Sequence, residues 1–163
     1  MPDQQRQFAI TRDGKPCATI VIPRAAEPRL LDAVADFVHV IERMAGPTAP
    51  VLTDGIHTGN GAEIHIGLTD FVKQERLLPE SLPVNGYRIA VCEENGQPRL
   101  VIAGPTTLGT THGVAGFLTD DLGVLWGMCS RDSPSFTLTR SENRASGSGS
   151  AVVTCRQLKN SMR

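Results

Sequence analysis

The segment that most constrains the fold is Leu100–Trp126, LVIAGPTTLGTTHGVAGFLTDDLGVLW. An apolar run of β-type residues leads into a turn at Gly104-Pro105, and a helix rich in small residues is expected over Thr107–Leu122. Each glycine inside a helix lowers intrinsic helicity by about 1 kcal/mol, so these glycines need a structural reason. A helix that lies close on a sheet requires small residues. The segment therefore predicts a strand followed by a helix packed against the sheet.

A second helix is predicted over Pro28–Ala45, where apolar residues recur at steps of three and four. This apolar stripe consists of Leu30, Leu31, Val34, Phe37, Val38, Ile41 and Met44. Proline suits the first turn of a helix because its missing N–H costs nothing there. The Gly46-Pro47 pair ends the helix. Such a stripe is typical of a helix that covers a core.

The remaining elements are short. Strands are predicted at Gln7–Thr11, Ala18–Ile22, Pro50–Leu52, Glu63–Gly67, Gly86–Cys92 and Arg99–Ala103. The turn dipeptides Asp13-Gly14 and Asn95-Gly96 predict hairpins between the first two and the last two of these strands. A short helix is expected over Thr69–Leu77, with Thr69 or Asp70 as its cap. The fold class is therefore α+β, with two main helices.

Composition excludes several classes of protein. The chain has 163 residues, which favours one domain, and we place it at residues 1–139. Residues 140–163 contain the linker-like stretch Ala145–Ser150 and more basic than acidic residues, so a flexible basic tail is expected. A formal net charge of −1 predicts no nucleic-acid partner. No apolar run has the roughly 20 residues that a membrane helix needs. No signal peptide is visible, and the compartment stays open.

Cysteine and histidine spacings indicate no metal centre and no cofactor. The four cysteines form no CxxC pair, so free thiols are expected, with a disulfide between Cys17 and Cys92 as an alternative. The HExxH pattern of helical zinc sites is absent. His65 is expected to face outward from its strand. Asp54 and His57 share a glycine-rich loop, where a small polar or metal site is one hypothesis.

Three further residues are candidates for binding or for an interface. His112 lies near the start of the second main helix, and helix N-termini favour anions. Trp126 and Tyr87 could stack on a sugar, although a tryptophan in an apolar run is more typical of a core or an interface. No pair of carboxylates is placed for glycoside hydrolysis, and no GxSxG motif is present. We therefore predict no catalytic set.

The motifs NGYRIAV and Leu100–Trp126, taken with the element order, resemble a known family. They are similar to the non-catalytic N-terminal domain of glycoside hydrolase family 67 α-glucuronidases and to the second domain of family 20 β-hexosaminidases. The matching positions are Gly86, Tyr87, Arg88, Ile89, Gly109, Gly113, Val114, Phe117, Leu118, Leu122, Gly123 and Trp126. The resemblance implies a mixed β-sheet with two main helices on one face, zincin-like but without a metal centre.

The resemblance also implies a function. Such a domain supports a catalytic (β/α)8 barrel or its substrate cleft, and is not itself an enzyme. The catalytic carboxylates of these families lie on the barrel, which the residues after Arg131 are too few to form. Leu108, His112 and Ala115 stand where the family commonly has arginine and two tyrosines, which puts direct sugar contact in doubt.

Two alternative functions stay open. The first is a free-standing homo-oligomeric interaction module, or a carbohydrate-binding module, that associates through an apolar face near Leu125 and Trp126. The second is a small metal- or ligand-binding protein that uses Asp54 and His57.

Overall fold

The centre of the molecule is a mixed five-stranded sheet. The computed structural model describes residues 6–13, 15–46, 49–56, 61–125, 137–138 and 152–155. The strand order is β5-β4-β6-β8-β7. Its strands are β4 (Ala18–Ile22), β5 (Val51–Thr53), β6 (Ala62–Ile66), β7 (Arg88–Glu94) and β8 (Gln97–Ala103). The first four strands in this order run parallel, and β7 pairs antiparallel with β8 at the edge. The class is α+β, as predicted.

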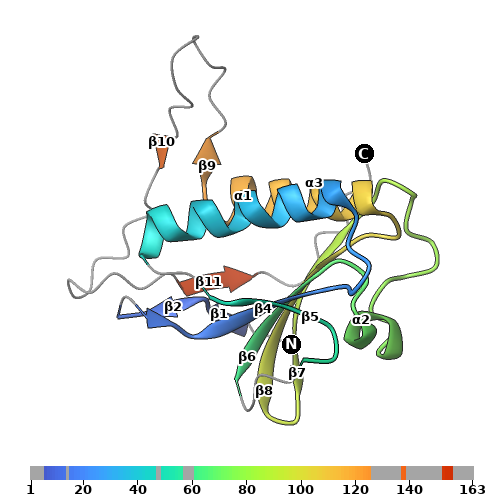
Figure 1. The fold of residues 1–163 in the computed structure, drawn as a ribbon, viewed down its shortest axis with the longest axis horizontal. Coiled ribbons are helices and arrows are strands. Elements are labelled where there is room, and N and C mark those ends of the chain that lie inside the picture. Colours follow the sequence, from blue (N-terminus) through green and yellow to red (C-terminus); the bar gives the residue numbers. More distant parts are fainter. Residues whose placement is uncertain are drawn as a thin grey trace, which may run out of the picture.

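Two helices, α1 (Pro28–Ala45) and α3 (Thr107–Gly116), lie together on one face of this sheet (Figure 1). The predicted bounds of α1 are confirmed at both ends. The second helix is confirmed over α3, but it then widens into the π-helical turn η1 (Phe117–Asp121), where Leu122 N–H donates to the Phe117 carbonyl at 3.2 Å. Among the described residues, no helix is long and apolar enough to cross a membrane.

The small helix α2 (Asp70–Gln74) covers part of the opposite face. Alternation along β8 explains how one strand serves both layers, since successive side chains point to opposite faces. Leu100 and Ile102 belong to the core beneath α1 and α3, whereas Val101 and Ala103 contact Val72 of α2. The sheet therefore has a large apolar layer on one side and a small one on the other.

The large core joins the two main helices directly. The rings of Phe37 in α1 and Phe117 in η1 have centroids 5.8 Å apart. The prediction that Leu31 belongs to the apolar stripe of α1 is wrong, because Leu31 is 46% exposed. It lies one residue, or about 100°, around the helix from the buried Leu30, which places it beside the stripe rather than within it.

Three two-stranded pairs complete the described structure. They are β1 (Arg6–Ala9) with β11 (Val152–Cys155), β2 (Thr11–Arg12) with β3 (Lys15–Pro16), and β9 (Val124–Leu125) with β10 (Thr137–Leu138). The predicted pairing of Gln7–Thr11 with Ala18–Ile22 is wrong. The turn at Asp13 joins β2 to β3, and β4 lies between β5 and β6, where its apolar residues are buried. Part of the expected tail, β11, is thus a strand.

Glycines bring α3 into close contact with the turn that precedes β7. A Cβ on Gly109 would overlap the carbonyl oxygen of Gly86, and one on Gly113 would lie 3.1 Å from the Tyr87 Cβ. A Cβ on Gly116 would lie 2.5 Å from the Tyr87 hydroxyl. We call these five residues the α3–Tyr87 joint. Their small size is the structural reason for a helix of low intrinsic propensity.

The joint predicts that Gly109→Ala destabilises the protein strongly. The added methyl meets backbone, which cannot rotate away, so we expect a loss of about 2–3 kcal/mol in the free energy of unfolding. Gly61→Ala is the matched control, because nothing lies within 4 Å of its Cβ position. Urea denaturation of both variants measures the difference, and equal stability would contradict the close approach.

Candidate functional site

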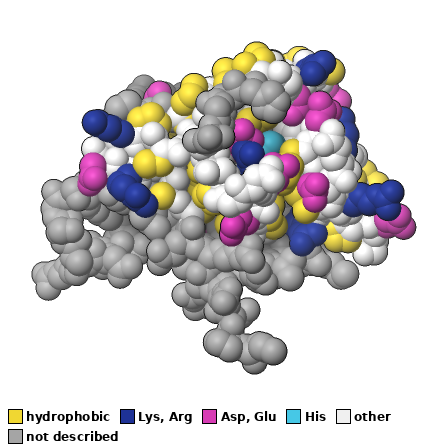
Figure 2. Space-filling view, turned by 90° about the horizontal axis from the view of Figure 1, so that it is seen from below, with side chains coloured by type: hydrophobic (Ala, Val, Ile, Leu, Met, Phe, Trp, Pro, Cys, Tyr) yellow, Lys and Arg dark blue, Asp and Glu magenta, His cyan; other side chains and the backbone are white. Residues whose placement is uncertain are grey.

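A row of charged and polar side chains crosses the face of the sheet that carries α2, and His65 lies in the row beside it. Register places Thr19, Glu63, Arg99 and Cys92 side by side on adjacent strands, and Val21, His65, Val101 and Ala90 in the next row. Figure 2 views the molecule from below Figure 1, onto the side away from α1 and α3. Acidic, basic and histidine side chains gather near the middle of that view. A connected group of polar side chains lies in these two rows.

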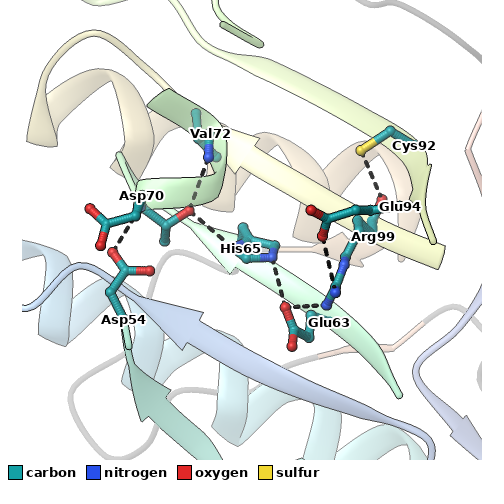
Figure 3. A network of polar contacts seen from close by, with 9 residues as sticks. Asp54, Glu63, His65, Asp70, Val72, Cys92, Glu94 and Arg99 are labelled. Carbon is teal, nitrogen blue, oxygen red and sulfur yellow. Dashed lines mark hydrogen bonds and ion pairs between the residues drawn. The ribbon is translucent and has the colours of Figure 1, made fainter. Parts of the chain in front are cut away.

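His65 is the centre of this group, which we call the His65 network (Figure 3). Its Nε2 lies 3.1 Å from Glu63 Oε2, and its Nδ1 lies 3.0 Å from Thr69 Oγ1. A carboxylate can only accept a hydrogen bond, so Nε2 carries the ring proton and Nδ1 accepts from the Thr69 hydroxyl. These two hydrogen bonds fix one tautomer and one orientation of the imidazole.

Arg99 closes the network on the side of β8 and β7. Its guanidinium forms an ion pair with Glu63 on β6, and its Nη2 lies 3.2 Å from Glu94 Oε2. Phe71 of α2 packs against both His65 and Arg99. Its ring centroid lies 4.7 Å from the His65 ring centroid and 5.8 Å from Arg99 Cζ. Arginine beside an aromatic ring gains cation–π attraction. Three strands and α2 thus meet at one set of contacts.

Thr69 connects the network to the helix. It is the N-cap of α2, and its Oγ1 accepts from Val72 N–H at 3.5 Å while donating to His65. An N-cap side chain satisfies one of the free N–H groups of the first turn. The single hydroxyl therefore serves both the helix end and the imidazole.

Burial keeps His65 uncharged. The expectation that it faces outward is wrong, because Phe71 of α2 packs over the ring and only 3% of the residue is exposed. Loss of solvation lowers the pKa of His65 below 6.5, and Arg99 lowers it further, while Glu63 and Glu94 raise it. Desolvation is the largest of these effects. At neutral pH the ring is therefore neutral, as its acceptor role toward Thr69 requires.

The order hydroxyl, imidazole, carboxylate is also the order of a nucleophilic triad. Here, however, the Thr69 hydroxyl is 0% exposed and already accepts the capping hydrogen bond. A substrate carbonyl could not reach it without displacement of α2. The geometry supports a structural link between α2 and the sheet better than it supports acyl transfer.

Asp54, one of the predicted site residues, caps the same helix from another loop. Its Oδ2 accepts from Asp70 N–H at 3.0 Å, and its carbonyl accepts from Arg24 Nε at 3.0 Å. Burial raises the pKa of Asp54 above 3.8, opposed by the hydrogen bond from Asp70. Its partner in the predicted loop site, His57, lies outside the described residues.

The other predicted candidates do not meet Asp54. His112 is exposed on α3, where its Nδ1 lies 3.4 Å from the Asn85 carbonyl oxygen. Tyr87 is half-buried in the α3–Tyr87 joint. Trp126 lies outside the described residues. Tyr87 and His112 thus both lie at the contact between α3 and residues 85–87, whereas Asp54 caps α2.

Metal and disulfide hypotheses can be compared with the described residues. Within that part of the chain, no group of three or more histidine, cysteine, aspartate or glutamate side chains is placed to hold a metal ion. Cys17 and Cys92 are free thiols. The idea that they sit on neighbouring strands is wrong, because β6 and β8 separate β4 from β7. Three strand spacings correspond to about 14 Å, far beyond disulfide reach.

Sequence reasoning missed the His65 network although part of its signal was present. Glu63 and His65 alternate onto one face of a strand, and Thr69 follows four residues after His65. What the pattern did not reveal was the pairing of Glu63 with Arg99 across the parallel β6–β8 ladder. It also did not reveal that α2 folds back over this face.

Comparison with known proteins adds no family to this geometry. No model of a protein family matches the chain, and no curated protein matches it significantly.

Replacing Asp54 should separate its capping role from its charge. Asp54→Ala removes the acceptor for Asp70 N–H, so we expect a loss of about 1 kcal/mol in unfolding free energy. Asp54→Asn keeps an acceptor oxygen without a buried charge and should stay near wild type. Thermal or urea denaturation at neutral pH compares the two. Equal losses in both variants would contradict the capping role.

Thr69 variants test the double role of its hydroxyl. Thr69→Val preserves the side-chain shape but removes the donor to His65 and the acceptor for Val72, which should cost about 1–2 kcal/mol. Thr69→Ser keeps the hydroxyl and should retain most of the stability. Urea denaturation gives the free energies. If the valine variant is as stable as the serine variant, the hydroxyl has no such role.

Proposed function

We propose that this chain is a non-catalytic accessory domain of a carbohydrate-active enzyme. Its role is to support a catalytic (β/α)8 barrel or to help shape the substrate cleft of that barrel. The barrel is the partner that the family resemblance implies, whether it belongs to the same polypeptide or to another.

The observation that carries this proposal is the α3–Tyr87 joint. The contacting residues of the two motifs are far apart in sequence, with Gly86 and Gly109 separated by 23 positions, yet Gly86 and Tyr87 on one side meet three glycines of α3 on the other. Val114, Phe117 and Leu118 of the same motif are buried in the large core. The shared residues thus act together as one packing unit, which favours a likeness of fold over a chance match of glycines.

Solvent access to the polar side chains supports a non-catalytic role. The His65 network has the hydroxyl, imidazole and carboxylate that chemistry would need, but His65 and Thr69 are buried under α2. Asp54 is likewise committed to a helix cap. Each of these groups already has an intramolecular partner.

The outer side of α3 supports docking over direct sugar binding. His112 and Ala115 are exposed and Leu108 is half-buried, at positions where the family commonly carries arginine and tyrosines. Sugar recognition depends on polar groups and aromatic faces, and of these three positions only His112 offers either. A barrel surface is a more suitable partner for this side of α3 than a free sugar.

Two measurements test the proposal. The purified chain should not hydrolyse aryl α-glucuronides or aryl β-hexosaminides; hydrolysis that disappears on replacement of a single carboxylate would refute a non-catalytic role. The natural reading frame and its neighbours should then be examined for a barrel. Co-expression with that barrel should raise its soluble yield and Tm, with Gly109→Ala as the control that disrupts the joint. A barrel equally stable without the chain would oppose a supporting role.

A further inference from the structure

The α2 segment, residues 68–78, depends on tertiary contacts for its position. Its helix has five residues, far fewer than the 12–15 at which isolated helices become even marginally stable. Val72 packs on Val101 and Ala103, and the Leu77 carbonyl accepts from the guanidinium of Arg88. Two further polar attachments run through Thr69 to His65 and through Asp70 to Asp54. Losing one of them should affect the segment before the rest of the fold.

The attachment to His65 requires a neutral ring. Nδ1 can accept from the Thr69 hydroxyl only while it holds a lone pair, and a protonated imidazole is a donor at both nitrogens. Protonation would reverse this hydrogen bond: Nδ1–H would donate to Thr69 Oγ1, which can still accept from Val72 N–H, but the Thr69 hydroxyl proton would lose its acceptor in a covered site. The same event would place a positive charge in a covered site close to Arg99.

The charged groups that face His65 come from three strands. Glu63 on β6 contacts the ring directly, Arg99 on β8 pairs with Glu63, and Glu94 on β7 pairs with Arg99. From α2 the ring faces the uncharged Thr69 and Phe71. The negative charge of Glu63 would stabilise an imidazolium, but Glu63 already forms an ion pair with Arg99. Burial and the positive charge of Arg99 oppose protonation in the closed arrangement. If the segment opened, water would solvate the imidazolium and screen its repulsion from Arg99.

We propose that His65 is an acid-sensitive latch that holds the α2 segment on the sheet. With the ring neutral the segment is closed; with the ring protonated it detaches, exposing Val72, Val101 and Ala103 while α1, α3 and the sheet stay folded. This inference is independent of the proposed accessory role, because it concerns only contacts within the chain.

The sign of the pH dependence follows from proton linkage. Burial lowers the pKa of His65 below 6.5 in the closed form, whereas an open, solvated ring titrates near that value. Between the two pKa values the open form binds a proton that the closed form does not. Closure is therefore most stable above this window and weakens as the pH falls through it, by at most about tenfold per pH unit for one proton.

Residue-resolved amide hydrogen exchange tests the latch. The reporters are the amides of Val72, Lys73 and Glu75, which donate within α2. Protection factors, corrected for intrinsic exchange rates, should fall as the pH is lowered from about 7.5 to about 5, approaching tenfold per unit. Amides in the middle of α1 should keep their protection. A parallel loss in α1 would mean that the protein unfolds globally, and the latch would be refuted.

The variant His65→Gln identifies the titrating group. Glutamine can donate to Glu63 and accept from Thr69 without binding a proton in this range, so protection of the α2 segment should become independent of pH. Glu63 and Glu94 are unchanged in this variant, and a persistent pH dependence would assign the effect to them and overturn the proposal. His112→Gln is the matched control on an exposed histidine and should behave like wild type.

A spectroscopic measurement keeps the test independent of that variant's folding. Nitrogen-15 NMR of the wild-type imidazole should show the Nε2–H tautomer of His65 at neutral pH, and its titration should coincide with the loss of α2 protection. A ring that is already charged at neutral pH, or that titrates without any change in α2, would overturn the latch.

Discussion

The approach of α3 to the turn before β7 determines where the other layers lie. The Gly86 carbonyl occupies the space that a side chain at residue 109 would need, so the helix and the turn meet backbone to backbone. From that position α3 continues into η1, whose Phe117 contacts Phe37 of α1. The large core therefore depends on a contact that only glycine permits, and a wider spacing would leave a gap in the core that close-packed proteins do not tolerate.

The two faces of the sheet solve different physical problems. Beneath α1 and α3, burial of apolar side chains supplies the stabilisation. Beneath α2 the chain covers an imidazole, a guanidinium and carboxylates, which requires that each have partners. A covered ion pair of this kind adds little net stability. Because Glu63 and Arg99 are directly opposed in the parallel ladder, however, a slipped register would separate them, so the pair favours one alignment of β6 with β8.

Local sequence patterns predicted the helices and strands themselves better than they predicted which elements pack side by side. The bounds of α1 and the turn at Asn95-Gly96 follow from a helical stripe and from turn chemistry, both of which operate within a few residues. The position of β4 between two parallel strands does not follow from such local patterns, because it depends on segments more than thirty residues away. For the same reason the sequence placed Glu63 and His65 on one face without indicating what covers them. The contacts of Asp54 and Tyr87 likewise became visible only once distant turns were brought together.

The pairing of β1 with β11 has a consequence for synthesis on the ribosome. Phe8 lies opposite Val153 in this ladder and is fully buried. At translation rates of about 5–20 residues per second, roughly seven to thirty seconds separate the appearance of these two residues. During that interval β1 has no β11 partner, and an unpaired strand edge that carries the apolar Phe8 is a template for aggregation. Factors that shield nascent chains would therefore affect the folding yield of this protein through β1.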